Sequence, residues 1–219
     1  MQGEGYLAIW SDLAPPDETD WAHWITREHA AERVGINGFL ACRIFRALGV
    51  AVNRYFILYE LANENVVGSA DYLARLNAPT PWSQKTMPKL GNFARGGGRI
   101  AASAGIGQGG IVAPLRLQST PSWDAAAVAA ELANLDRIIA ARVLLTDAAQ
   151  TSIKTREKGM RGNDGSFAAL ALIEGLDETA VRNALQHLRP ILSADDRGEI
   201  DASPLYRLAF SLPKQLLPG

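Results

Sequence analysis

Residues 21–45 read WAHWITREHAAERVGINGFLACRIF, and this stretch decides the fold because it joins a helix to a strand through a short turn. Apolar and aromatic residues recur at helical spacing from Trp21 to Val34, which predicts a helix with one buried face. Gly35 and Gly38 then break the pattern, and an apolar run typical of a strand follows at 39–45.

The same order of elements occurs twice along the chain. In the first half, strands are predicted at residues 6–10, 39–45, 55–61 and 92–100, with helices at 21–34 and 70–76. In the second half, strands are predicted at 111–117, 138–145, 167–173 and 205–212, with helices at 123–135 and 178–192. Each half therefore reads β-α-β-β-α-β, the ferredoxin-like order. The predicted fold class is α+β, with tandem ferredoxin-like repeats at 1–104 and 105–219 that pack their sheets into one intrachain α+β barrel.

Three segments carry weaker patterns. The strand at 92–100 contains a run of three glycines, which lowers its strand propensity. Residues 77–90 include three prolines and are predicted to form a loop. Residues 151–165 are basic and then rich in glycine, which favours an exposed loop; its positive charges could bind an anionic partner or remain solvated.

Composition narrows the class of protein. The 219 residues carry 22 basic and 23 acidic side chains, and this near balance argues against nucleic acid as the main partner. Cys42 is the single cysteine, which excludes an intrachain disulfide and a multi-cysteine metal site. The first residues lack a secretory pattern, and the longest apolar run, 167–173, is too short to span a bilayer. We therefore expect a cytoplasmic protein without a membrane partner.

The helix and turn of the opening stretch also carry a family resemblance. The pattern Trp21-x-x-Trp24-x-x-x-Glu28-His29, followed by Gly38 and an arginine-bearing strand, resembles the dimeric α+β barrel (ferredoxin-like) superfamily, in particular its EthD-like and uncharacterised members. The usual proline before the glycine is absent here. The resemblance covers the first half of the chain and implies a barrel of two sheets with a cavity between a sheet and its covering loops. Relatives include cofactor-free monooxygenases, muconolactone-type isomerases, polyketide cyclases and some haem enzymes, so fold narrows the chemistry only loosely.

His29 is the predicted catalytic residue. A neutral imidazole can take a proton from a carbon acid or a phenol near pH 7 and return it later. Glu28, Glu32 or Arg33 could orient the ring, and the alternative is a surface histidine paired with a glutamate. His23 lies on another side of the same helix and is expected to be a surface or interface residue.

Aromatic side chains of the first half could line a substrate pocket or simply fill the core. Arg43 could hold a carboxylate or phenolate if it faces the cavity, and alternation along its strand leaves its direction open. The predicted substrate-binding residues are Trp21, Trp24, Arg43, Tyr59, Trp10 and Tyr6.

The predicted function is a small cofactor-independent enzyme of the isomerase, cyclase, lyase or monooxygenase type, acting on an aromatic or polyketide-like molecule. No cofactor or metal is predicted: Gly105-x-Gly107-x-x-Gly110 leads into a strand instead of a helix, so it lacks dinucleotide-binding geometry. The second repeat has alanines in its first helix and is expected to be mainly structural. Two alternatives stay open, a non-catalytic ligand-binding or assembly protein and a haem-binding barrel with His29 as axial ligand. The expected partner is a small aromatic or apolar molecule, and a homodimer through an outer surface also stays open.

Overall fold

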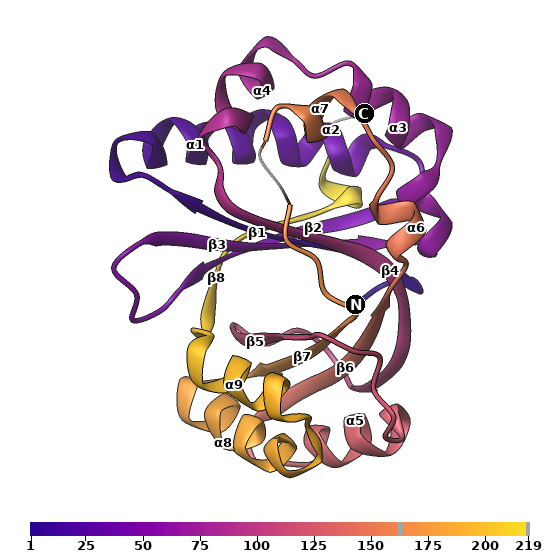
Figure 1. The fold of residues 1–219 in the computed structure, drawn as a ribbon, viewed down its shortest axis with the longest axis vertical. Helices are drawn as coiled ribbons and strands as arrows, with labels where there is room; N and C mark the ends of the chain where they lie inside the picture. Colours follow the sequence, from indigo (N-terminus) through magenta and orange to yellow (C-terminus); the bar gives the residue numbers. More distant parts are fainter. Residues whose placement is uncertain (162–163, 218–219) are drawn as a thin grey trace.

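The computed structural model describes residues 1–161 and 164–217. Within them, eight strands close into an antiparallel barrel in the order β1-β3-β2-β8-β5-β7-β6-β4 (Figure 1). The strands are β1 Gly5–Leu13, β2 Phe39–Ala47, β3 Asn53–Leu61, β4 Gly91–Gly105, β5 Ile111–Leu117, β6 Ile138–Thr146, β7 Ala169–Gly175 and β8 Tyr206–Pro213.

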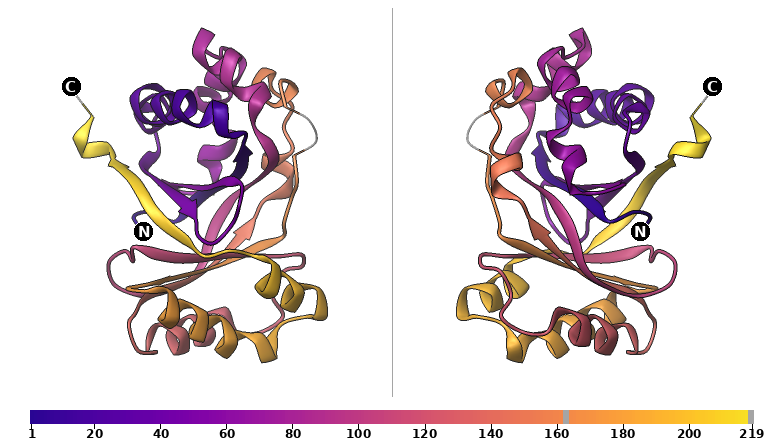
Figure 2. Two further views of the ribbon diagram at one scale, coloured as in Figure 1. Left: turned by 90° about the vertical axis from the view of Figure 1, so that its left-hand side faces the viewer. Right: turned by 90° about the vertical axis from the view of Figure 1, so that its right-hand side faces the viewer.

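Helices form one layer above and one layer below the barrel (Figures 1 and 2). The layer on the first repeat contains α1 Glu18–Trp24, a π-helical segment Ile25–His29, α2 Ala30–Gly35, α3 Ala70–Asn77, α4 Pro81–Thr86 and α7 Arg156–Gly159, with α6 Ala148–Thr151 at its edge. The layer on the second repeat contains α5 Ala125–Ala133, α8 Glu178–Leu188 and α9 Ala194–Ala202. Among the described residues, no helix is long and apolar enough to cross a membrane.

The two halves repeat each other down to the register of their strands. Ala41 of β2 pairs with Glu60 of β3, and Ala140 of β6 pairs with Glu174 of β7 at the same place beside a bulge. β4 of the first repeat pairs with β6, and β8 of the second repeat pairs with β2, so each half completes the other's sheet. The predicted α+β class, with two ferredoxin-like repeats in one barrel, is confirmed.

Side chains from both sheets fill the interior of the barrel. Its apolar core includes Trp10, Phe56 and Phe167, with the Trp10 ring centroid 4.8 Å from that of Phe56 and 5.3 Å from that of Phe167. Gly96 of β4 is required here, because a Cβ atom at this position would lie 2.3 Å from the ring of Phe167. The barrel therefore has a packed centre, and space for a ligand must be sought outside it.

Several boundaries differ from the sequence prediction. β4 runs for 15 residues, because its glycines admit neighbouring side chains and backbone that would clash with larger residues. The predicted loop at 77–90 contains α4, which starts with Pro81 at its first turn, where a missing N–H costs nothing. The predicted loop at 151–165 contains α7, while its residues 162–163 lie outside the described part of the chain. α9 was not predicted, because its apolar periodicity is weak.

Candidate functional site

His29 lies at the end of an irregular turn within the first helix. Residues Ile25–His29 form a π-helical segment between α1 and α2, and the Ala30 N–H donates to the Ile25 carbonyl. The Thr26 hydroxyl donates to the Ala22 carbonyl at 2.6 Å within this widened turn. Such π-bulges are rare and occur frequently at functional sites. The bulge places His29 under the helix, facing the sheet, with 6% of the residue exposed.

The surroundings of His29 keep its imidazole neutral. Burial lowers its pKa well below the ordinary value of 6.5, and the positive charges of Arg33 and Arg161 lower it further. The ring stacks on Trp24 with centroids 4.2 Å apart. Its buried Nδ1 atom has no hydrogen-bond partner among the described residues, and the nearest carboxylate oxygen, Glu32 Oε2, is 3.8 Å away. A buried imidazole that stays neutral is available for proton transfer.

An enclosed cavity of about 40 Å³ lies between the first sheet and the helices that cover it. This volume holds only a few water-sized molecules. Its wall is made by Ile9, Ser11, Trp21, Trp24, Ile25, His29, Arg33, Ile57, Tyr59, Tyr72, Leu76, Met87, Leu90, Phe93, Arg95, Glu157 and Arg161. We call this space the His29 cavity.

Polar atoms that lack partners gather around the His29 cavity. Ser11 Oγ and Trp21 Nε1 are buried without a hydrogen-bond partner in the described part of the chain, as is Nδ1 of His29. The Tyr59 hydroxyl is also enclosed, beside Cys42, and burial raises its pKa well above the ordinary value. Buried polar groups are normally satisfied, and an unsatisfied one requires an explanation. A ligand with polar substituents would supply these missing partners.

Charged side chains close the outer end of the His29 cavity. Arg33 is paired with Glu157 of α7, and Arg161 is paired with Asp164 at 3.3 Å. The Arg161 guanidinium also stacks over the Phe93 ring, 3.9 Å from its centroid. The cavity therefore has aromatic and aliphatic walls below and an end beside α7 that is lined by ion-paired side chains.

The structure divides the residues predicted from the sequence into two groups. Trp21, Trp24 and Tyr59 line the His29 cavity together with His29. Tyr6 and Trp10 belong to the apolar core on the opposite, barrel-facing side of the same sheet, and Trp10 also lines the open cleft at the mouth of the barrel. The Tyr6 hydroxyl is bonded to Thr146 Oγ1 at 2.8 Å there.

Like Tyr6 and Trp10, Arg43 faces the interior of the barrel. The alternation of residues along its strand did not determine this direction. Its guanidinium contacts Glu60 at 3.3 Å and Glu174 at 2.7 Å, and Arg142 binds the same Glu174. A bulge between Phe39 and Ala41 changes the alternation along β2, so Phe39 packs beneath the helices whereas Arg43 faces the interior of the barrel. Arg43 and Glu60 come from one repeat, and Arg142 and Glu174 from the other. This buried charge cluster joins the two halves.

Several residues of the His29 cavity were not found by sequence reasoning. Ser11, Arg95 and Glu157 lie on segments far apart in the chain and meet only through tertiary structure. Arg95 stands next to the glycine run of β4, where nothing in the local pattern indicates a buried charge. Arg161 belongs to the basic segment that was predicted as an exposed loop.

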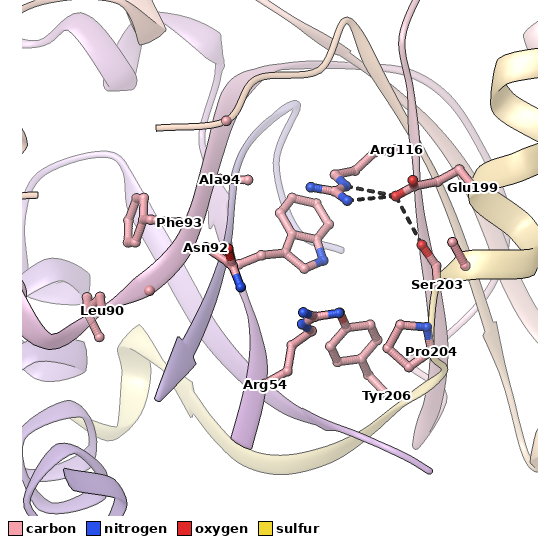
Figure 3. A pocket seen from close by; sticks show the side chains of 14 residues that line it. Arg54, Leu90, Asn92, Phe93, Ala94, Arg116, Glu199, Ser203, Pro204 and Tyr206 are labelled. Carbon is pink, nitrogen blue, oxygen red and sulfur yellow. Dashed lines mark hydrogen bonds and ion pairs between the residues drawn. The ribbon is translucent and has the colours of Figure 1, made fainter. Parts of the chain in front are cut away.

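A larger, open cleft of about 740 Å³ lies at one mouth of the barrel. Figure 3 shows Tyr206, Arg54 and Arg116 around it. Arg116 is bonded to Glu199 at 2.8 Å, so this arginine already has a carboxylate partner. Leu90 and Phe93 line both this mouth cleft and the His29 cavity. These two side chains separate the cavity from the cleft.

The second repeat carries apolar residues at the positions where the first repeat carries His29 and Arg33. The turn after each first helix has the same hydrogen bonds, Ile36 N–H to Arg33 and Leu135 N–H to Leu132. Counting back along the helices from this match makes Leu132 equivalent to Arg33, and Val128 equivalent to His29. Both pack in an apolar cluster between the second sheet and its helices.

Comparison with known proteins supports the fold. No family model and no curated protein sequence matches the chain. An anthrone oxidase-like protein of known structure is similar, with a TM-score of 0.60 and 13% identity over 100% of this chain and 96% of that one. A Fusobacterium nucleatum protein provisionally named a monooxygenase has a TM-score of 0.53 and 9% identity over 98% and 96% of the two chains. A chlorite dismutase variant from Candidatus Nitrospira defluvii has a TM-score of 0.51 and 8% identity over 94% and 92%. The chain thus has the dimeric α+β barrel fold, with both halves of the barrel in one polypeptide.

Proposed function

We propose that this protein is a cofactor-independent enzyme that takes a proton from a small aromatic or polyketide-like molecule, with His29 as the acid–base residue. The observation that carries the proposal is the buried, neutral imidazole facing a cavity whose Ser11 hydroxyl and Trp21 indole N–H lack partners among the described residues. Enclosed polar groups of this kind, in an apolar wall, are the usual features of a small-molecule site.

The chemistry follows from the arrangement of donors and acceptors. A proton on Nδ1 would face the Glu32 carboxylate, and this tautomer leaves the Nε2 lone pair free to accept a proton from the substrate. The anion that remains on the substrate would accept hydrogen bonds from the Trp21 N–H and the Tyr59 hydroxyl. Arg33 and Arg161 make a protonated His29 costly in the empty protein, and a substrate anion formed beside the ring offsets this cost.

Substrate entry requires side-chain movement. The His29 cavity holds about 40 Å³, which is less than a one-ring or two-ring compound needs. Leu90 and Phe93 separate it from the mouth cleft of about 740 Å³, so rotation of these two side chains would join the spaces. We infer that the substrate enters from this cleft.

Haem does not fit the residues around His29. A macrocycle would need several hundred cubic ångströms beside the imidazole, and the enclosed space is about 40 Å³. Trp24 is stacked on the ring and Arg33 is anchored to Glu157, so the helix and α7 would have to separate from the sheet. No step of the proposed reaction therefore involves haem.

Anthrone is a suitable test substrate, because one structural neighbour is described as anthrone oxidase-like and the ring has an acidic CH₂ group. Without oxygen, the enzyme should speed the exchange of this CH₂ proton with deuterated solvent. With oxygen, CH₂ plus O₂ would give a carbonyl and water, measured by oxygen uptake. His29→Asn should lower exchange by about 10²- to 10⁴-fold, the usual contribution of a general base.

The control is His187→Asn, since the His187 side chain is exposed on α8 and bonded to Glu131. This variant should exchange the proton at the wild-type rate. Binding of anthrone without His29-dependent exchange would favour the alternative of a non-catalytic ligand-binding protein. A Soret band in the purified protein would contradict the proposal and favour haem binding.

A further inference from the structure

Arg95 is a buried cation without a carboxylate partner among the described residues. It lies on β4 beside Ile9, lines the His29 cavity and is 8% exposed. Its guanidinium donates to the Thr151 carbonyl at 3.2 Å and to the Tyr72 hydroxyl at 3.3 Å. No carboxylate oxygen within residues 1–161 and 164–217 lies within 4.0 Å of it.

The other buried arginines differ from Arg95 in this respect. Arg33 is paired with Glu157, and Arg43 and Arg142 share Glu174. A buried guanidinium without a counter-ion is costly, so a protein normally pairs it. Arg95 therefore stands out as a buried charge that the described part of the chain leaves uncompensated.

A second cation lies beside Arg95. The Lys158 ammonium donates to the same Thr151 carbonyl at 3.4 Å, and no described carboxylate pairs with it either. Arg95 and Lys158 both line a surface cleft of about 400 Å³ that reaches from Thr146 to Phe167. Two positive side chains that share one neutral acceptor raise the local positive potential, which attracts an anion.

We propose that Arg95, assisted by Lys158, binds a carboxylate of the substrate, so that the compound acted on beside His29 is an aromatic acid. This inference rests on the proposed function for the identity of the ligand. The planar guanidinium of arginine matches a carboxylate with two parallel hydrogen bonds. Arg95 lines the His29 cavity and the surface cleft alike, so an acid group held there lets the attached ring extend towards His29.

The test compares the binding of 1-naphthoate with that of 1-naphthamide, its neutral analogue, by quenching of tryptophan fluorescence. Wild type should bind the acid about ten- to a hundredfold more tightly than the amide, as charge-assisted hydrogen bonds imply. Arg95→Gln should abolish this preference, Arg95→Lys should retain part of it, and Lys158→Gln should reduce it. Arg99→Gln removes an equal charge from an exposed position on the same strand and should leave the preference unchanged.

Other outcomes separate the two proposals. Equal binding of acid and amide by the wild type would overturn the carboxylate site, whatever His29 does. An Arg95-dependent preference for the acid, without His29-dependent proton exchange, would support the carboxylate site and refute the proposed reaction. Inorganic phosphate and chloride serve as free anions. If either one displaces naphthoate at low millimolar concentration, Arg95 binds simple anions and the aromatic-acid proposal is wrong.

Discussion

Replacing His29 with asparagine should make the stability of the protein less sensitive to mild acid. In the folded protein, burial and the neighbouring Arg33 and Arg161 hold the pKa of His29 well below 6.5. In the unfolded chain the ring is solvated and regains its ordinary pKa of 6.5. The unfolded chain therefore binds one proton more than the folded protein between pH 6.5 and the folded-state pKa.

The magnitude follows from proton linkage. The stabilisation that comes from a neutral His29 is fully present above pH 6.5 and is lost as the pH falls below it. Each pH unit in this window lowers the free energy of unfolding by about 1.4 kcal/mol. Between pH 7.5 and 5.5 the loss due to this one residue is therefore about 1.4 kcal/mol, a considerable part of a typical stability of roughly 5–15 kcal/mol.

Urea unfolding at pH 7.5, 6.5 and 5.5, followed by tryptophan fluorescence, measures this dependence (the three values span the ordinary pKa of 6.5). The wild type should lose about 1.4 kcal/mol more than His29→Asn over the range. His187→Asn, which removes an exposed imidazole, is the matched control and should behave as the wild type does. Equal slopes for wild type and His29→Asn would refute the buried, neutral state of His29 on which the proposed reaction depends.

Three further substitutions test the scaffold and the entrance. Phe93→Ala removes part of the wall between the mouth cleft and the His29 cavity, so stopped-flow fluorescence should show faster binding of 1-naphthoate; an unchanged rate would exclude this route. Glu174→Gln leaves the buried guanidiniums of Arg43 and Arg142 undercompensated and should lower the free energy of unfolding in urea by about 3–5 kcal/mol. The control Glu178→Gln removes an exposed ion pair with Arg207 and should lower it by only about 0–1 kcal/mol. Gly96→Ala places a Cβ against Phe167 and should cost about 1–3 kcal/mol in the same assay; unaltered stability would show that the ring can move aside.

The sequence predicted the fold well, because its evidence is periodic and local. The helix predicted at 21–34 and the strand predicted at 111–117 depend on neighbouring residues only. In the structure, Ser69 caps α3 by accepting from the Tyr72 N–H and Asp177 caps α8 by accepting from the Ala180 N–H, so these helix starts are also set by neighbouring residues. Local patterns of this kind survive folding unless tertiary contacts override them.

The candidate site was predicted only in part, because membership of a cavity depends on which side of the sheet each strand residue faces. Trp21, Trp24 and Tyr59 meet His29, whereas Trp10 faces the barrel interior. Alternation tells which residues of a strand share a face, but not which face the helices cover. A bulge in β2 shifts even this alternation, and β-bulges have no reliable local pattern in the sequence.

The irregular helix of the first repeat is the strongest argument that His29 was selected for function and not for packing. In the second repeat, the equivalent sheet is covered by the regular helix α5. Val128 and Leu132 stand there at the positions of His29 and Arg33 and pack in an apolar cluster. The first repeat instead keeps a π-helical segment, a buried imidazole and an arginine that needs Glu157 as its partner. Each of these features lowers stability relative to the apolar solution that the chain itself demonstrates. Features that break local rules without a structural gain are expected at functional sites, so the asymmetry of the two repeats favours the proposed site in the first repeat.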